Sequence, residues 1–217
     1  MRKLKLFILI LLIVTCSNLF AQTFGIKGGL NLSNMLEKDN RFKYSEEYKI
    51  KPGFNFGIAL YVPLTDPIAF ETGLIIDSKG YKSSYTIGNV EYKRTFSPYY
   101  VDIPLHFVYN TQLKGLNSFF YIGPYIGLGF AGKVTNKTIV SGVSSKSSNA
   151  INWGTANNST LKELDGGLDF GGGLDFGKIY YTANFGFGLA NTCSNTTTGR
   201  KYYNRVFNIS IGYKFLK

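Results

Sequence analysis

The stretch V-F-N-I-S-I-G-Y-K-F, residues 206–215, decides the fold of this chain. Apolar and small or polar residues alternate through it, so that Ile209, Ile211 and Tyr213 are separated by Ser210 and Gly212. Successive side chains of a β-strand point to opposite faces, so the stretch predicts a strand with one apolar and one polar face. Its ten residues match the length that a tilted strand needs to cross a bilayer, roughly 9 to 11 residues.

Seven further stretches show the same alternation and predict strands of similar length. In residues 120–130, for example, Ile126 belongs to the apolar face and Tyr125 to the opposite face. With the last stretch they make eight strands. The other seven are residues 24–32, 53–62, 68–79, 99–110, 120–130, 165–176 and 179–189.

The links between these strands alternate in length. Residues 63–67, 111–118 and 177–178 are short links, whereas residues 33–52, 82–97, 133–164 and 190–202 are mostly longer and polar. Short turns on one side and long loops on the other are typical of outer-membrane barrels, and an even strand number lets the first and last strands pair. We therefore predict an all-β, eight-stranded, antiparallel up-and-down transmembrane barrel with both termini in the periplasm.

Residues 1–21 have the features of an export signal, which leaves residues 22–217 as one barrel domain. Basic residues precede the apolar run 6–14, which is too short for a spanning helix, and cleavage is expected after Ala21. Lipidation at Cys16 is the alternative. After cleavage after Ala21, Cys193 would be the one remaining cysteine, so an intramolecular disulfide is excluded.

The basic charge of the chain is dispersed. Removal of residues 1–21 lowers the formal charge from +11 to +8, and the remaining basic residues are scattered through the predicted loops. Nucleic acid, which requires a contiguous basic face, is therefore not an expected partner. Outer-membrane lipid with an anionic surface is the expected counterpart.

The alternative fold is a soluble barrel in the periplasm that binds an apolar ligand. Such a barrel would have an apolar interior and a polar exterior. In this chain the apolar faces carry bulky aromatic residues, while the polar faces are rich in Gly, Asn, Tyr and Asp. Small and polar residues suit the narrow wet interior of an eight-stranded membrane barrel, so the composition of the faces favours the membrane.

The polar faces predict a lumen network of ion pairs and water, because charges in a narrow barrel must pair or stay hydrated. A proton or ion path through these charges is the alternative. We expect no catalytic residue, cofactor or metal; a metal site at Asp102, His106 and Asp169 and a hydrolase that uses His106 are the weaker hypotheses. The residues of the predicted network are Lys27, Glu71, Asp77, Lys79, Asp102, His106, Asp165, Asp169, Asp175 and Lys214.

The longest predicted loop, residues 133–164, carries many Ser and Asn residues and the single tryptophan, Trp153. One interpretation is a solvated loop without a binding role. The other is a surface for an envelope protein or a surface polysaccharide, since binding sites on rigid scaffolds concentrate in such loops.

Four segments resemble the PorT-like outer-membrane β-barrel family: residues 24–33 (FGIKGGLNLS), 100–106 (YVDIPLH), 121–127 (YIGPYIG) and 211–215 (IGYKF). The resemblance covers nearly all of the chain after residue 21. It implies an eight-stranded barrel that the barrel-assembly machinery inserts, and its namesake is linked to protein secretion. It assigns no functional residue.

The sequence thus favours a structural or interaction protein of the cell envelope, with an accessory role in secretion as one version. A small pore through the charged lumen is the alternative, and the soluble ligand-binding barrel is a weaker one.

Overall fold

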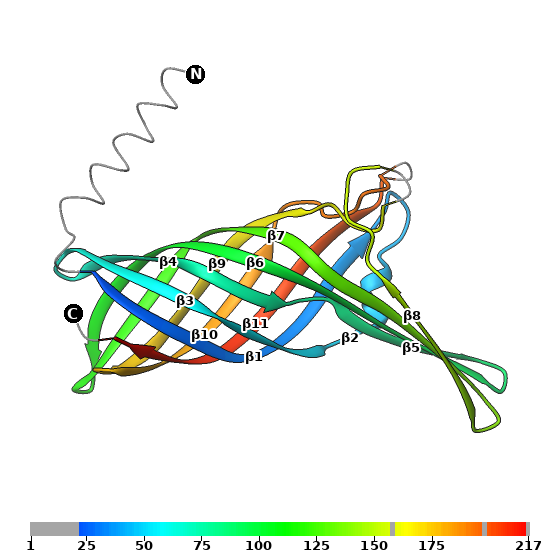
Figure 1. Ribbon diagram of the computed structural model, residues 1–217, viewed down its shortest axis with the longest axis horizontal. Helices are drawn as coiled ribbons and strands as arrows, with labels where there is room; N and C mark the ends of the chain where they lie inside the picture. The colour runs from blue at the N-terminus through cyan, green and yellow to red at the C-terminus, as the bar shows by residue number, and fades with distance from the viewer. Residues whose placement is uncertain (1–21, 157–158, 197–198, 216–217) are drawn as a thin grey trace, which may run out of the picture.

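The computed structural model describes residues 22–156, 159–196 and 199–215, and the expected signal, residues 1–21, lies outside this range. Eight antiparallel strands form a closed ring in the order β6, β4, β3, β1, β11, β10, β9, β7, and β7 pairs again with β6 (Figure 1). The predicted fold is therefore confirmed. The ring strands are β1 (Thr23–Lys38), β3 (Lys51–Thr65), β4 (Ile68–Ser78), β6 (Val90–Leu113), β7 (Leu116–Val140), β9 (Leu164–Phe176), β10 (Ile179–Gly188) and β11 (Lys201–Lys214).

The last strand closes the barrel. β11 pairs with β1 from Gly25↔Lys214 to Lys38↔Lys201, and on its other side with β10. The backbone N–H of Phe215 donates to the carbonyl of Phe24 at 2.8 Å. β1 therefore begins and β11 ends at the same end of the barrel, which we call the terminal end; the opposite end is the distal end (Figure 1).

In the strands of the ring, residues of the apolar face lie on the exterior of the barrel, and residues of the opposite face lie in the lumen. On β7, Ile122 and Ile126 are 61% and 44% exposed, whereas Tyr121 and Tyr125 are each 5% exposed. Because the exposed faces are apolar and aromatic, they suit contact with lipid. Further exposed residues of this exterior are Phe24, Leu30, Phe54, Phe56, Phe107, Phe120, Phe170, Ile209 and Ile211.

A β-bulge changes which residues of β7 face inward. Tyr100 pairs with Gly129 and Tyr99 with Ala131, so Phe130 has no partner on β6. Before the bulge the inward residues of β7 are odd-numbered; beyond it, Val134 lies opposite the buried Phe96. One extra residue in one strand exchanges the two faces of that strand.

Beyond the distal end, four strands continue as a sheet, the projecting sheet (Figure 1). It consists of β5 (Tyr81–Ile87), residues 90–97 of β6, residues 132–140 of β7 and β8 (Val143–Ala150). The prediction that residues 82–97 and 133–164 are loops is therefore wrong for most of these residues, although a turn at Gly88 and Asn89 does separate β5 from β6. The hairpins escaped detection because outside a bilayer neither face needs to be apolar; all eight residues of β8 are exposed.

A short segment lies beside this sheet. The 3₁₀ helix η1 (Tyr44–Glu47) leads into β2 (Tyr48–Lys49), which pairs with Lys82 and Ser83 of β5. Within the described ranges, no helix is long and apolar enough to cross a membrane.

Candidate functional site

Lys79, directly after β4, is the centre of a buried charge cluster in the lumen. Its Nζ lies 2.8 Å from Asp102 Oδ2 and 3.0 Å from Asp165 Oδ2, and its side chain is 2% exposed. The same Nζ lies 4.8 Å and 4.5 Å from the ring centroids of Tyr100 and Tyr125. Two carboxylates and two aromatic faces thus replace the hydration of this ammonium group.

His106 is the centre of a second cluster nearer the terminal end. Its Nε2 lies 3.0 Å from Asp169 Oδ2, its Nδ1 lies 3.6 Å from Glu71 Oε1, and its ring stacks on Tyr121 at 4.7 Å. Glu71 also accepts a hydrogen bond from Lys27 Nζ at 3.0 Å. Both nitrogens of His106 therefore face carboxylates, and neither faces the hydroxyl nucleophile that a hydrolase requires.

Of the three residues considered as a metal site, His106 and Asp169 are in contact and Asp102 is engaged elsewhere. Asp102 binds Lys79, whereas Asp169 binds His106. Among the residues that the structure describes, no group of three or more His, Cys, Asp or Glu side chains could hold a metal ion.

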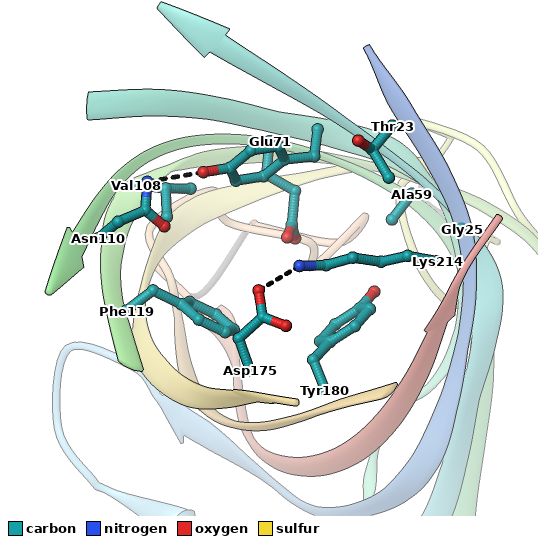
Figure 2. Close-up of a pocket in the computed structure, with 11 residues that line it drawn as sticks. Thr23, Gly25, Ala59, Glu71, Val108, Asn110, Phe119, Asp175, Tyr180 and Lys214 are labelled. Carbon is teal, nitrogen blue, oxygen red and sulfur yellow. Dashed lines mark hydrogen bonds and ion pairs between the residues drawn. The ribbon is translucent and has the colours of Figure 1, made fainter. Parts of the chain in front are cut away.

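Neutral polar side chains form a chain of hydrogen bonds that begins at Asp77. Asn31 Nδ2 donates to the carboxylate of Asp77, Asn55 Nδ2 donates to Asn31 Oδ1 at 2.7 Å, and Ser210 Oγ donates to Asn55 Oδ1 at 2.8 Å. At the terminal end, Lys214 binds Asp175 (Figure 2).

Little space remains between these groups. Lys214, Asp175 and Tyr180 point into a cavity at the terminal end (Figure 2). The volume of this cavity is about 30 Å³. A second cavity, of about 40 Å³, is lined by Asp77, His106 and other polar residues. A buried water requires roughly 10–15 Å³ measured in this way, so each cavity holds a few water molecules at most.

An apolar cluster closes the distal mouth. Residues 151–156 and 159–161 fold back over the lumen, so that Ile151 is 5% and Leu161 0% exposed. Trp153 lies edge-on to Tyr100 at 5.4 Å and directly over Gly129, where a Cβ would lie 2.1 Å from the indole ring. This mouth cluster consists of Met35, Tyr81, Phe96, Val134, Ile151 and Leu161, with Tyr48, Trp153 and Tyr202 packed against it.

Above the mouth cluster lies an open groove of about 560 Å³, the outer groove. One wall is the projecting sheet and the other is the segment 42–48. Asp39 fixes that segment, because its carboxylate accepts hydrogen bonds from the backbone N–H groups of Arg41 and Phe42 and from the hydroxyl of Tyr44. These bonds lower the pKa of Asp39. The lining residues are Phe42, Lys43, Tyr44, Glu46, Glu47, Tyr48, Tyr81, Ser83, Tyr85, Tyr92, Lys93, Arg94, Asn136, Lys137 and Thr138.

All ten charged residues that the sequence assigns to the lumen take part in these lumen contacts. The sequence did not indicate Tyr100 or Asn204, whose Nδ2 donates to Asp165 Oδ2 at 2.9 Å. Both lie in phase with inward residues of their strands, and this phase is the signal that could have identified them. The outer groove was missed altogether, because it depends on the two unpredicted hairpins.

A closed ring of eight strands with an apolar exterior and a polar interior defines an outer-membrane β-barrel protein. The family model of the outer membrane protein beta-barrel domain matches residues 20–194, and the chain belongs to this family. It is therefore an outer-membrane protein and not the soluble barrel considered above. The finer, PorT-like assignment stays a prediction.

Several solved structures have a similar fold. Neisserial surface protein A is 12% identical with a TM-score of 0.42, over 88% of this chain and 97% of that one. Ail of Yersinia pestis is 11% identical with a TM-score of 0.40, over 90% and 100%. OprG of Pseudomonas aeruginosa is 14% identical with a TM-score of 0.44, over 91% and 97%. At these values the likeness says nothing of function, and no curated protein matches the chain.

Proposed function

We propose that this protein is a binding protein of the cell surface: a barrel that does not conduct and that holds the projecting sheet outside the membrane. The observation that carries the proposal is the pairing of β6 with β7, which extends from Leu113↔Leu116 at the terminal end to Val90↔Val140 at the tip of the projecting sheet. The sheet is thus a continuation of the transmembrane strands.

The lumen supports the same proposal. The charges that suggested an ion path are engaged with one another, as Lys79 is with Asp102 and Asp165. The two lumen cavities described above are small, and the mouth cluster covers the distal end of the lumen. A pore is therefore the less favoured function, and we expect no channel activity from the purified protein in planar lipid bilayers.

The proposal places the terminal end in the periplasm and the projecting sheet outside the cell. We also propose that the barrel contacts outer-membrane lipid and is inserted by the barrel-assembly machinery. An accessory role in secretion is a further proposal. An envelope protein that contacts residues 133–164 would be recovered with the intact barrel by affinity purification in mild detergent. A barrel that is consistently recovered alone would contradict the secretion role.

The orientation is tested with single cysteines in a Cys193→Ser background. Val143, at the tip of the β7–β8 hairpin, is 76% exposed, and Leu116, which begins β7 directly after the β6–β7 turn, is 48% exposed. A membrane-impermeant maleimide should label Val143→Cys on intact cells and Leu116→Cys only after the outer membrane is permeabilised. The reverse pattern would overturn the proposed function.

A further inference from the structure

The outer groove has a layered floor, because the strands of the projecting sheet are in register. Tyr81, Phe96 and Val134 form one row across β5, β6 and β7 and belong to the mouth cluster. Two residues further out, Ser83, Arg94 and Asn136 form a polar row. The outermost row is Tyr85, Tyr92 and Thr138. Since side chains two residues apart share a face, the three rows line one surface: apolar at its base, then cationic and amide, then phenolic.

The basic groups of the groove exceed its acidic groups. Four basic residues line it, namely Lys43, Lys93, Arg94 and Lys137, against Glu46 and Glu47. Among those on β6 and β7, Arg94 belongs to the rows of the floor, whereas Lys93 and Lys137 pair with each other one residue out of phase with these rows. Within the described ranges, Lys43 pairs with Glu46 and Lys93 with Glu91, whereas neither Arg94 nor Lys137 forms an ion pair. An exposed guanidinium group without a carboxylate partner offers a planar fork that suits sulfate, phosphate or carboxylate.

The tyrosines offer hydroxyl groups and ring edges more than free ring faces. Tyr48 stacks on Tyr81 at 3.7 Å with an angle of 6°, and Tyr85 stacks on Tyr92 at 5.1 Å with an angle of 19°. One face of each of these four rings is covered by its partner, which leaves less ring surface for the base stacking that binding of single-stranded nucleic acid favours. Phenol, hydroxyl and amide groups, at Tyr85, Tyr92, Ser83, Thr138 and Asn136, instead match the hydroxyl groups of sugars.

The direction in which the groove opens distinguishes a free chain from a lipid headgroup. Its floor is continuous with the row of Tyr81 and Phe96, which are 5% and 2% exposed above the lumen. The groove therefore lies on the lumen side of the projecting sheet and not on the side that continues the lipid-facing surface. A lipid neighbour in the same membrane meets the opposite face.

We propose that the outer groove binds an anionic polysaccharide chain from outside the cell. Arg94 binds the acidic groups of the polysaccharide, and the Tyr85–Tyr92 pair, Ser83 and Asn136 form hydrogen bonds with its hydroxyl groups. This inference rests on the proposed function, since it requires the projecting sheet to be outside. It adds the chemical class of the ligand.

The test uses the mature protein in phosphatidylcholine nanodiscs, with dextran sulfate as the probe and uncharged dextran of equal length as the matched control. Dextran sulfate should bind, and uncharged dextran should bind far more weakly. Arg94→Gln and Tyr92→Leu should each weaken binding about tenfold, the effect of losing one strong polar contact. Lys146→Gln removes the same charge from β8, outside the groove, and should leave the affinity within about twofold of the wild type.

Equal losses for Arg94→Gln and Lys146→Gln would overturn the proposal, because binding would then depend on general charge. Tighter binding of polyglutamate or of a thymidine oligonucleotide would overturn it in favour of an acidic peptide or of nucleic acid. Each variant is first checked for the mobility shift on boiling that marks a folded barrel. If dextran sulfate fails to bind while Val143→Cys is still labelled on intact cells, the ligand class is wrong and the proposed function stands.

Discussion

Lys79 and Asp165 are 86 residues apart in sequence, yet Lys79 Nζ lies 3.0 Å from Asp165 Oδ2 inside the barrel, with side chains 2% and 0% exposed. Lys79 also neutralises Asp102. We expect Lys79→Met to lower the free energy of unfolding by about 3–5 kcal/mol, because it leaves two buried carboxylates without their cation.

Urea unfolding in lipid vesicles, followed by the fluorescence of Trp153, measures this loss. The double variant Lys79→Met, Asp165→Asn is the control and should be more stable than Lys79→Met alone, since one uncompensated charge is gone. A loss below about 1 kcal/mol in Lys79→Met would mean that this pair behaves as an exposed one.

The two faces of β7 give a second prediction. Ile126 is 44% exposed on the lipid side, and the hydroxyl of Tyr125 donates to Asp165 Oδ2 at 3.3 Å in the lumen. Ile126→Arg should cost about 2–4 kcal/mol if this side chain lies near the bilayer midplane. Tyr125→Phe should cost about 1 kcal/mol, the value of one hydrogen bond. The same unfolding assay compares them, and the reverse order would contradict the assignment of the faces.

Close packing in the lumen gives a third prediction. A Cβ at Gly212 would lie 2.0 Å from Cζ of Tyr180, which is 5% exposed. Gly212→Ala should therefore destabilise the barrel by about 1–3 kcal/mol through overpacking. In a Tyr180→Ala background the same substitution should cost much less, because the ring that it meets is gone. Equal costs in the two backgrounds would show that the ring of Tyr180 is not the source of the cost.

Asp39 gives a fourth prediction, for the wall of the outer groove. Asp39→Ala removes the acceptor for three hydrogen bonds, so trypsin should cleave after Arg41 severalfold faster in the folded protein. Lys146→Gln is the control and should not change that rate. Because the bonds lower the pKa of Asp39, their stabilisation is present above its ordinary pKa and is lost as the pH falls through the lowered value. Unchanged cleavage in Asp39→Ala would show that another contact fixes the segment.

The sequence predicts the ring strands well, because each must present an apolar face to lipid and a polar face to the lumen. Residues 206–215 and 120–130 show this alternation without interruption. Beyond Phe130 the strand no longer needs one apolar face toward lipid and one polar face toward the lumen. The strand V-S-S-K-S-S-N-A, residues 143–150, has water on both faces, so nothing in its pattern separates it from a loop.

The lumen residues could be assigned to a face but not to one another. Period two places Glu71, Asp102 and Asp165 inside the barrel without giving the register between strands. Whether Asp102 would meet His106 or Lys79 depended on that register. The residues of the outer groove could not be predicted from the alternation at all, because the bulge at Phe130 exchanges the faces of β7 before the groove begins.

Because β6 and β7 continue from the barrel into the projecting sheet, the number of residues in these strands sets the distance of the groove from the membrane. Asn136 lies six residues beyond Phe130, about 20 Å along the strand. Removing two residues from each strand of the projecting sheet would lower the groove toward the lipid and keep Arg94 on the same face. Removing one would turn the whole binding surface to the opposite side. Descendants of this sequence can therefore change the reach of the sheet only in steps of two residues, unless a second bulge arises with the change.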